Sequence, residues 1–476
     1  MKARGQGVLT VVVAGVVAIG VLSLDRLGPR QPSGAAPATA TSATWLCPHG
    51  GGKGYEGTVF VANPGDAPVT ARVTELDSGA AARASEVLVP PGAQVEIDVS
   101  ASERAASTFV ETFGGWVGVG WLIRGAEGEG GVGAEPCAAE AGRDWVSAAP
   151  TTGEGDDAYL VVMNPFDTDA VFDVALFSTD RAPVRHANLT DVTVKPRRSA
   201  AIRLNLFAQG EVGLGVSLEV SSGRVAASTL VVSEGRGIGS VLASAAPAQR
   251  QVLLTSSGVG RSVLAVAVPT VVDDPATATA TATPQPLGQL GSTFTATLRS
   301  QDPPQPAGGL VDQAQEPESA ATYPITTTGA SAVDLVVNQG APLVAALRTA
   351  GVGRDGGATA GSVAPASSWV VTPTIAGDPA RPGLLLLNPG ESPATVTITS
   401  IPAEGAAPSE TTVTVPEGSV AVVGREFLEG VGAASLLVIA EGSPVVALGA
   451  STSLGNDGLS LLGLAAGVPI PQTDTP

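Results

Sequence analysis

The chain contains only two cysteines and two histidines, which restricts the chemistry that it can perform. Cys47 closely follows Trp45 and Cys137 lies shortly before Trp145, so a bond between the cysteines would join the two ends of the segment between these tryptophans. Such bonds form in an oxidising compartment. The alternative is a metal site of Cys47, His49 and Cys137, which supplies three candidate ligands and no fourth. The sequence therefore predicts a disulfide between Cys47 and Cys137.

Carboxylates are the other groups that could act chemically. Two sets of closely spaced acids lie in expected loops: Glu154, Asp156 and Asp157 in one, and Asp167 and Asp169 in the other. Paired acids can hydrolyse glycosides or bind Ca²⁺, but acids in glycine-rich loops are more often simply solvated. His186 lies outside any catalytic motif, and the chain has no G-x-S-x-G, H-E-x-x-H, P-loop or EF-hand pattern. We therefore expect no enzymatic activity, no cofactor and no metal, with an acid-pair hydrolase as a minor alternative.

Two tryptophans, Trp116 and Trp121, have no counterparts elsewhere in the chain. They lie five positions apart on one expected strand, so they should face opposite sides of a sheet. One of them could fill a core while the other stacks on a sugar or contacts a partner. The alternative is that neighbouring loops or the following unit cover both indoles. Trp116 and Trp121 are therefore the candidate residues for ligand or partner contact.

A repeat of about a hundred residues positions these side chains, which indicates an array of whole β domains. Each clear copy has a tryptophan, an Asn-Pro turn, a later proline and a closing valine: Trp45, Asn63-Pro64, Pro90 and Val117; Trp145, Asn164-Pro165, Pro196 and Val225; Trp369, Asn388-Pro389, Pro416 and Val445. A worn copy lies between the second and last of these, without the tryptophan or the Asn-Pro turn. Its segment 288–321 has the composition of a long mobile loop.

Strict alternation of apolar and polar residues within the copies indicates strands with one buried face. Val69, Ala71 and Val73 show this period of two most clearly. Six or seven short strands in each copy, separated by proline and glycine turns, are typical of a β-sandwich of immunoglobulin or fibronectin type III style. A β-propeller is the second choice, because its blades are about half as long. The predicted fold is therefore all-β, with tandem sandwich repeats after an N-terminal transmembrane helix.

The amino terminus indicates the compartment. An uncharged apolar run at 7–24 is long enough to cross a bilayer, and Lys2 and Arg4 precede it. A cleaved signal peptide is the alternative, although its apolar core is usually shorter. We expect a single-pass protein of the cell membrane, with the bulk of the chain outside. The expected segments are a cytoplasmic tail at 1–6, a signal anchor at 7–24, a Pro/Ala/Thr-rich stalk at 25–44, and β units at 45–140, 141–248, 249–360 and 361–470.

The charge of the chain argues against one class of partner. The formal net charge is −19, and no basic stripe with interleaved aromatic residues offsets it. Such a surface repels a phosphate polyanion, so we expect no binding to nucleic acid. The acidic surface instead favours solubility.

The turn sequences Asn63-Pro64-Gly65-Asp66 and Asn388-Pro389-Gly390-Glu391 carry a resemblance to known proteins. With the strand that follows each of them, they resemble the strand-turn-strand of bacterial extracellular Ig-like modules. Asn164-Pro165-Phe166-Asp167 departs from this pattern, and the worn copy lacks it. The whole chain is similar to a family of membrane-anchored actinobacterial envelope proteins of unknown function. That resemblance implies a compartment and supplies no catalytic residues.

These observations lead to an expected function. We expect a non-enzymatic structural or interaction protein of the cell envelope, which presents tandem β-sandwich domains outside the membrane. The alternative is a carbohydrate-binding accessory to cell-wall or polysaccharide assembly. The expected partners are the membrane and either cell-wall glycan or envelope proteins.

Overall fold

A computed structural model describes most of the chain after the expected stalk. The described residues are 42–79, 83–125, 131–179, 181–233, 237–243, 247–254, 260–269, 291–300, 305–306, 309–327, 330–350, 356–362, 364–374, 381–455 and 458–471. The expected tail at 1–6, the anchor at 7–24 and nearly all of the stalk at 25–44 lie outside them. Among the described residues, no helix is long and apolar enough to span a membrane.

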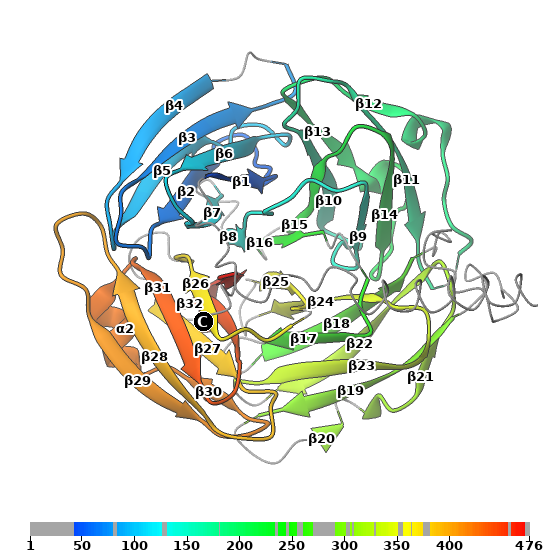
Figure 1. Cartoon of the computed structure of the whole chain (residues 1–476). Coiled ribbons are helices and arrows are strands. Elements are labelled where there is room, and N and C mark those ends of the chain that lie inside the picture. Colours follow the sequence, from blue (N-terminus) through cyan, green and yellow to red (C-terminus); the bar gives the residue numbers. More distant parts are fainter. Residues whose placement is uncertain are drawn as a thin grey trace, which may run out of the picture. The chain divides into compact units, whose positions relative to one another are not determined.

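The described chain is all-β, as predicted, and consists of eight antiparallel sheets in four pairs (Figure 1). Each pair encloses a core of alternating apolar side chains, so each pair is a sandwich. The first sandwich comprises β1 (Ser42–Cys47), β2 (Glu56–Ala62), β3 (Val69–Leu76), β4 (Arg83–Val89), β5 (Gln94–Ser100), β6 (Ser107–Phe113), β7 (Gly118–Arg124) and β8 (Val132–Pro136). The second comprises β9 (Asp144–Ser147), β10 (Asp156–Asn164), β11 (Ala170–Phe177), η1 (Ala187–Leu189), β12 (Val192–Val194), β13 (Arg198–Arg203), η2 (Leu204–Leu206), β14 (Gly215–Ser222), β15 (Ala226–Ser233) and β16 (Gly237–Leu242).

The other two sandwiches follow in the same way. The third comprises β17 (Arg250–Leu254), β18 (Gly260–Val268), β19 (Ser292–Arg299), β20 (Gln305–Pro306), β21 (Gln313–Gln315), β22 (Ser319–Thr327), β23 (Ala332–Gly340), β24 (Val344–Ala350) and β25 (Gly356–Ala360). The fourth comprises β26 (Ser368–Val371), β27 (Arg381–Leu387), β28 (Ala394–Ile401), β29 (Glu410–Val415), β30 (Val420–Val422), α2 (Arg425–Val431), β31 (Ser435–Glu441), β32 (Val446–Gly455), β33 (Gly458–Ala466) and β34 (Val468–Pro469).

All four sandwiches share one strand order. If the strands of a sandwich are counted from one to eight, one sheet has the order 1-6-3-4 and its partner 5-2-7-8. We call these the A sheet and the B sheet. In the third sandwich both β20 and β21 pair with β19 at the fourth position, and in the fourth sandwich the short β34 extends the A sheet. The worn third copy has therefore kept the topology of its neighbours.

The third sandwich corrects one expectation from the sequence. The segment 288–321, predicted as a long loop, contains β19 and β21, and β22 begins within it. In β19 the side chains alternate, with Phe294 and Ala296 fully buried and their threonine neighbours half-buried. The pattern was obscured because threonine occupies the outward positions and because glutamine- and proline-rich sequence follows the strand.

The asparagine of each Asn-Pro turn joins the two sheets of its sandwich. Asn63 accepts a hydrogen bond from the amide of Gly65 and donates to the carbonyls of Ala67 (2.8 Å) and Val89 (3.2 Å), so it links the turn after β2 to the end of β4. Asn164 and Asn388 make the corresponding bonds, to Val194 and Val415 respectively at the ends of β12 and β29. All three amides are buried. The repeated Asn-Pro is therefore a structural joint.

Loss of this joint should be measurable. We expect Asn388→Ala to lower the free energy of unfolding by about 2 kcal/mol, because it leaves buried carbonyls without donors. Denaturant unfolding measures the change, with Asn338→Ala, an exposed asparagine, as the control. An effect no larger than that of the control would show that the turn does not depend on the buried amide.

The leading tryptophan makes a fixed hydrogen bond in the second and fourth sandwiches, whereas Nε1 of Trp45 in the first has no partner among the described residues. The indole Nε1 of Trp145 donates to the carbonyl of Val225 (2.9 Å), and that of Trp369 donates to Val445 (2.9 Å). In the third sandwich Gln251 occupies the equivalent place, and its amide donates to the carbonyl of Leu343. The worn copy has thus replaced a tryptophan by a smaller side chain that keeps the same bond.

Successive sandwiches share apolar interfaces between an A sheet and the next B sheet. At the second interface, Phe177 of β11 packs on alanines of β18 and β22. At the third, Leu254 of β17 packs with Leu385 and Leu387 of β27. The core of the first sandwich also includes Leu230 of the second. Residues Thr41–Pro471 accordingly form one compact unit, which differs from an array of separate domains.

The fourth sandwich contacts the first and completes the cycle of interfaces. Gln94 of β5 is buried there, and its side-chain oxygen accepts hydrogen bonds from the amide (2.7 Å) and hydroxyl (2.6 Å) of Ser435 in β31. Gly120 of β7 allows a close approach, since a Cβ there would lie 2.1 Å from Oγ1 of Thr372. The eighth strands of all four sandwiches, β8, β16, β25 and β33, contact one another in the same cycle. Glycine and alanine are frequent in these strands, which permits close packing.

Candidate functional site

Three candidate residues from the sequence, Cys47, Trp121 and Cys137, lie in the core of the first sandwich. Cys47, at the end of β1, forms a disulfide with Cys137, which directly follows β8. The disulfide is confirmed, and both cysteines are buried. Cys47 is therefore not a metal ligand, and no cluster of potential ligands occurs among the described residues.

Trp121 lies inside this core rather than on the surface. Its side chain is 1% exposed and packs in the cluster that includes the disulfide, so it presents no face to a sugar or a partner. Trp121 therefore has the core position expected for one of the two tryptophans, and it is not the residue that contacts a ligand or partner. It points inward because β7 places alternate residues, Val119, Trp121 and Ile123, in the core.

Trp116 is half-buried and precedes β7, so the two tryptophans do not share a strand as expected. The chain turns between β6, which ends at Phe113, and β7, and Trp116 lies in this turn; Gly114 supplies the positive φ of 105° that the turn requires.

The ring of Trp116 meets that of Trp45 edge to face, with 5.9 Å between centroids. Trp116 also packs against Val370 and Ile401 of the fourth sandwich. It therefore contributes to the interface between the first and fourth sandwiches.

His49 is a buried neutral histidine beside Trp121. Its Nδ1–H donates to the carbonyl of Gly50 (2.7 Å) and Nε2 accepts from the hydroxyl of Thr108 (3.0 Å). Burial lowers the pKa of His49 to about 4, against a smaller raising effect of the bond to Gly50. The ring centroid lies 5.9 Å from that of Trp121. Both nitrogens are thus engaged in local structure.

Glu135 is a buried carboxyl that the sequence did not reveal. It lies on β8 directly opposite Trp121 on β7, and its side chain is 1% exposed. Its Oε1 and the indole Nε1 of Trp121 have no hydrogen-bond partner in the described part of the chain. Burial raises the pKa of Glu135 well above its usual value. The sequence offers one sign of this burial: Glu135 is a single acid in a short run of small and apolar residues before Cys137.

The acid sets and His186 are all engaged in local contacts. Asp156 accepts hydrogen bonds from the hydroxyls of Thr151 (3.1 Å) and Ser233 (2.7 Å). Asp157 forms an ion pair with Arg203, Asp167 with Arg197, and Asp169 with Lys195. His186 caps the short helix η1 by accepting from the amide of Asn188 (3.0 Å). In these contacts the side chains stabilise surface strands and turns.

An ionic triad around a buried carboxylate in the third sandwich was also not predicted. Asp334 of β23 is 3% exposed and forms bidentate hydrogen bonds with Arg250, both 2.8 Å long. Arg299 donates to the same carboxylate from Nε (3.0 Å) and Nη2 (2.7 Å). Burial alone would raise the pKa of Asp334, but the bonds from the two arginines outweigh it and lower the pKa. The carboxylate is therefore stabilised in its charged form.

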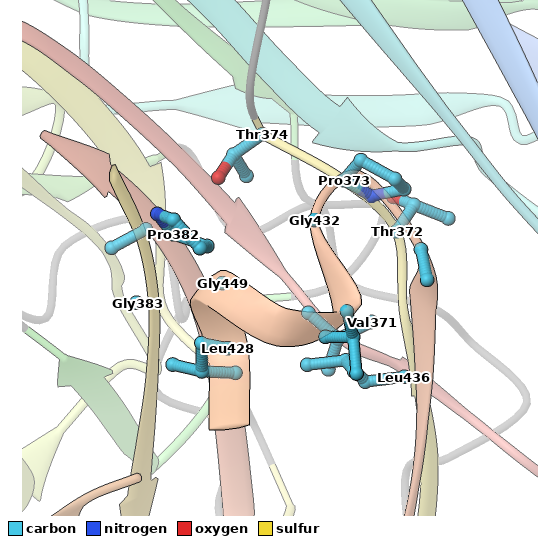
Figure 2. Close-up of a pocket in the computed structure, with 13 residues that line it drawn as sticks. Val371, Thr372, Pro373, Thr374, Pro382, Gly383, Leu428, Gly432, Leu436 and Gly449 are labelled. Atoms are coloured by element: carbon cyan, nitrogen blue, oxygen red, sulfur yellow. The ribbon is translucent and has the colours of Figure 1, made fainter. Parts of the chain in front are cut away.

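A small cavity lies in the fourth sandwich between α2 and strands β26, β27 and β32 (Figure 2). Leu428 and Leu436 line it, and Thr372 and Thr374 are at one end. Its volume is about 30 Å³. A water molecule needs roughly 10–15 Å³ of such space, so the cavity has room for solvent, and it is far below the roughly 300 Å³ of a small-molecule site.

Exposed apolar side chains lie in a row on the A sheet of the first sandwich. Phe113 of β6 is 47% exposed and Leu88 of β4 is 60% exposed. Both are paired with Thr70 of β3, so the three residues cross the sheet side by side on one face. Arg72, Glu86 and Glu111 form the next row on this face. The row of Leu88, Thr70 and Phe113 is an apolar strip with charged neighbours.

Fold and site together define an all-β repeat protein in which the recurring polar side chains join sheets and strands. The chain belongs to the group described as "Family of unknown function (DUF5719)", whose model matches residues 114–426. No curated protein matches the chain. One similar solved structure is described as "Crystal structure of tetra-tandem repeat in extending region of large adhesion protein". It is 11% identical with a TM-score of 0.08, over 86% of this chain and 94% of that one.

Proposed function

We propose that this protein is a non-enzymatic structural or interaction protein of the cell envelope. The segment 7–24 anchors it in the membrane, and the four Ig-like sandwiches lie outside, as in a membrane-anchored actinobacterial envelope protein. The observation that supports this proposal is that the residues that recur from copy to copy have structural roles. The repeated asparagines, and Trp145, Trp369 and their substitute Gln251, each hold parts of the architecture together.

The disulfide supports the extracytoplasmic location. Disulfides persist in oxidising compartments and are rare in reducing ones. The bond between Cys47 and Cys137 is buried and joins β1 to the residue that follows β8. The first sandwich is therefore suited to an oxidising environment.

The apolar strip of the first sandwich is the contact surface in this proposal. Aromatic and aliphatic side chains exposed in one place are favoured at contacts with partners. The alternative function, a carbohydrate-binding accessory to wall or polysaccharide assembly, loses Trp121 as a stacking platform because that indole is buried. Phe113 is an exposed ring of the first sandwich that could serve this alternative.

A binding comparison tests the proposal. The variant Leu88→Ser with Phe113→Ser should lose at least about tenfold in retention of envelope proteins that the wild type captures, a loss of about 1.4 kcal/mol. Val422→Ser, an exposed valine on the fourth sandwich, is the matched control. Parallel incubation with purified cell-wall polysaccharide distinguishes the alternative. Equal retention by wild type, double variant and control would contradict a contact at the strip.

A further inference from the structure

Glu135 lies where the first sandwich meets its neighbours. Strand β8 contacts β16 of the second sandwich and β33 of the fourth. The neighbouring core contains Ile238 of β16 together with Trp121 and the disulfide. Glu135 Oε1 has no hydrogen-bond partner among the described residues, and the indole opposite it is likewise unpaired. A carboxyl group has thus been placed at a junction built otherwise from apolar and small residues.

No compensating charge faces this carboxyl from the strands around it. Strands β16, β25 and β33 contain no acidic, basic or histidine residue. On β7, the basic residue Arg124 is at the end of the strand and pairs with Glu56 of β2. His49, which contacts Trp121, is neutral at ordinary pH because burial lowers its pKa to about 4. Among the described residues, an ionised Glu135 would therefore have no cation beside it.

An isolated buried carboxylate is strongly unfavourable, and such a group keeps its proton or gains water. We propose that Glu135 is a proton-dependent latch: as the buried acid it keeps β8 packed on β16, and loss of its proton loosens that junction. The step is a simple transfer of one proton from the carboxyl to solvent, which leaves the carboxylate. The loosened state admits water to the anion.

The direction of the pH effect follows from burial. Burial raises the pKa of Glu135 in the folded chain above its unfolded value, so the folded state binds more protons between these two values. The stabilising effect of the proton is complete below the unfolded pKa of about 4.3 and is lost as the pH rises through the folded pKa. Across that window the unfolding equilibrium constant should increase about tenfold per pH unit from this group alone.

His49 has the opposite dependence and sets the acidic limit. Its folded pKa of about 4 lies below the unfolded value of 6.5, so its neutral form stabilises the fold above pH 6.5 and that contribution falls as the pH drops towards 4. The clearest test of Glu135 is therefore above pH 6.5, where His49 is neutral in both states.

The test compares the full chain with Glu135→Gln, a neutral side chain of nearly the same shape. Denaturant unfolding between pH 6.5 and 9 (about the range in which His49 no longer titrates) should show the wild type losing stability until the folded pKa is passed. Glu135→Gln should remove this loss and be the more stable protein at the alkaline end. Glu86→Gln, an exposed glutamate on β4, is the matched control and should follow the wild type.

Two further measurements keep the test decisive. Amide hydrogen exchange should accelerate in β8 and β16 with rising pH, beyond intrinsic chemistry, and not in the distant β29. Infrared absorption of a protonated carboxyl should be present in the wild type at neutral pH and absent in Glu135→Gln, whichever protein is more stable. Identical pH profiles for wild type and Glu135→Gln, or no protonated carboxyl at neutral pH, would overturn the proposal.

Discussion

Replacing both cysteines by alanine is expected to lower the free energy of unfolding by about 4–5 kcal/mol. The bond between Cys47 and Cys137 closes a loop with a sequence separation of 90 residues, so it removes much conformational freedom from the unfolded chain. The core around it also includes residues of the second sandwich, so the loss should reach beyond the first sandwich. Denaturant unfolding of Cys47→Ala with Cys137→Ala measures the effect.

Reduction of the wild type provides the control for the alanine variant. The chain contains no other cysteine, so reduction cannot produce a rearranged bond within it. Reduced wild type and the alanine variant should therefore unfold at similar denaturant concentrations. A loss below about 1 kcal/mol, well under the usual range for a native disulfide, would show that the bond does not stabilise the fold.

Asp334→Ala is expected to cost about 3 kcal/mol of unfolding free energy, since removing one partner of a buried ion pair leaves uncompensated charge. The figure is at the low end of the usual range because the Arg250 side chain is 47% exposed and can be partly solvated. Asp334→Asn should be milder, because it keeps the shape and one acceptor. Thermal or denaturant unfolding at neutral pH measures both variants.

The same triad gives a pH dependence on the acidic side. The lowered pKa of Asp334 means that its contribution is present above the unfolded pKa and is lost as the pH falls through the folded value. The wild type should therefore lose its advantage over Asp334→Asn in acid. Asp98→Ala, an exposed acid on β5, is the control. Equal stability of Asp334→Ala and this control would contradict a structural role for the triad.

Local patterns in the sequence predicted much of each sandwich. Alternation such as Val69, Ala71 and Val73 placed a strand correctly, because one face of a sheet must be apolar. The Asn-Pro turns were recognised from residue type, but the buried bond from Asn63 to Val89 depends on a strand far along the chain. Local reading failed for β19, where threonines and an adjoining proline-rich segment resemble a loop.

Such local patterns could not predict how the sandwiches pack against one another. Leu230 completes the core of the first sandwich, and Gln94 bonds to Ser435, which lies 341 positions further along the chain. A repeat shows that units are alike, while the contacts between units depend on surfaces that differ from copy to copy. Gln94 reads as an ordinary polar strand residue until Ser435 is placed beside it.

The candidate site was predicted in part for the same reason. Residue type was enough to pair Cys47 with Cys137, because two cysteines in an oxidising compartment have one intramolecular bond to make. The exposure of the two tryptophans was harder to predict, because it depends on packing: Trp121 lies within the core and Trp116 lies at the interface with the fourth sandwich. Glu135 was missed because burial of an acid is a property of the packed strands around it.

The four sandwiches close into one unit through contact of the fourth with the first. Small-angle X-ray scattering from residues 41–471 tests it most directly. The closed arrangement predicts a radius of gyration of about 22 Å, the value for a compact chain of this length. Four sandwiches strung in a line would give roughly 40 Å, and a value near that would contradict the closed cycle of interfaces.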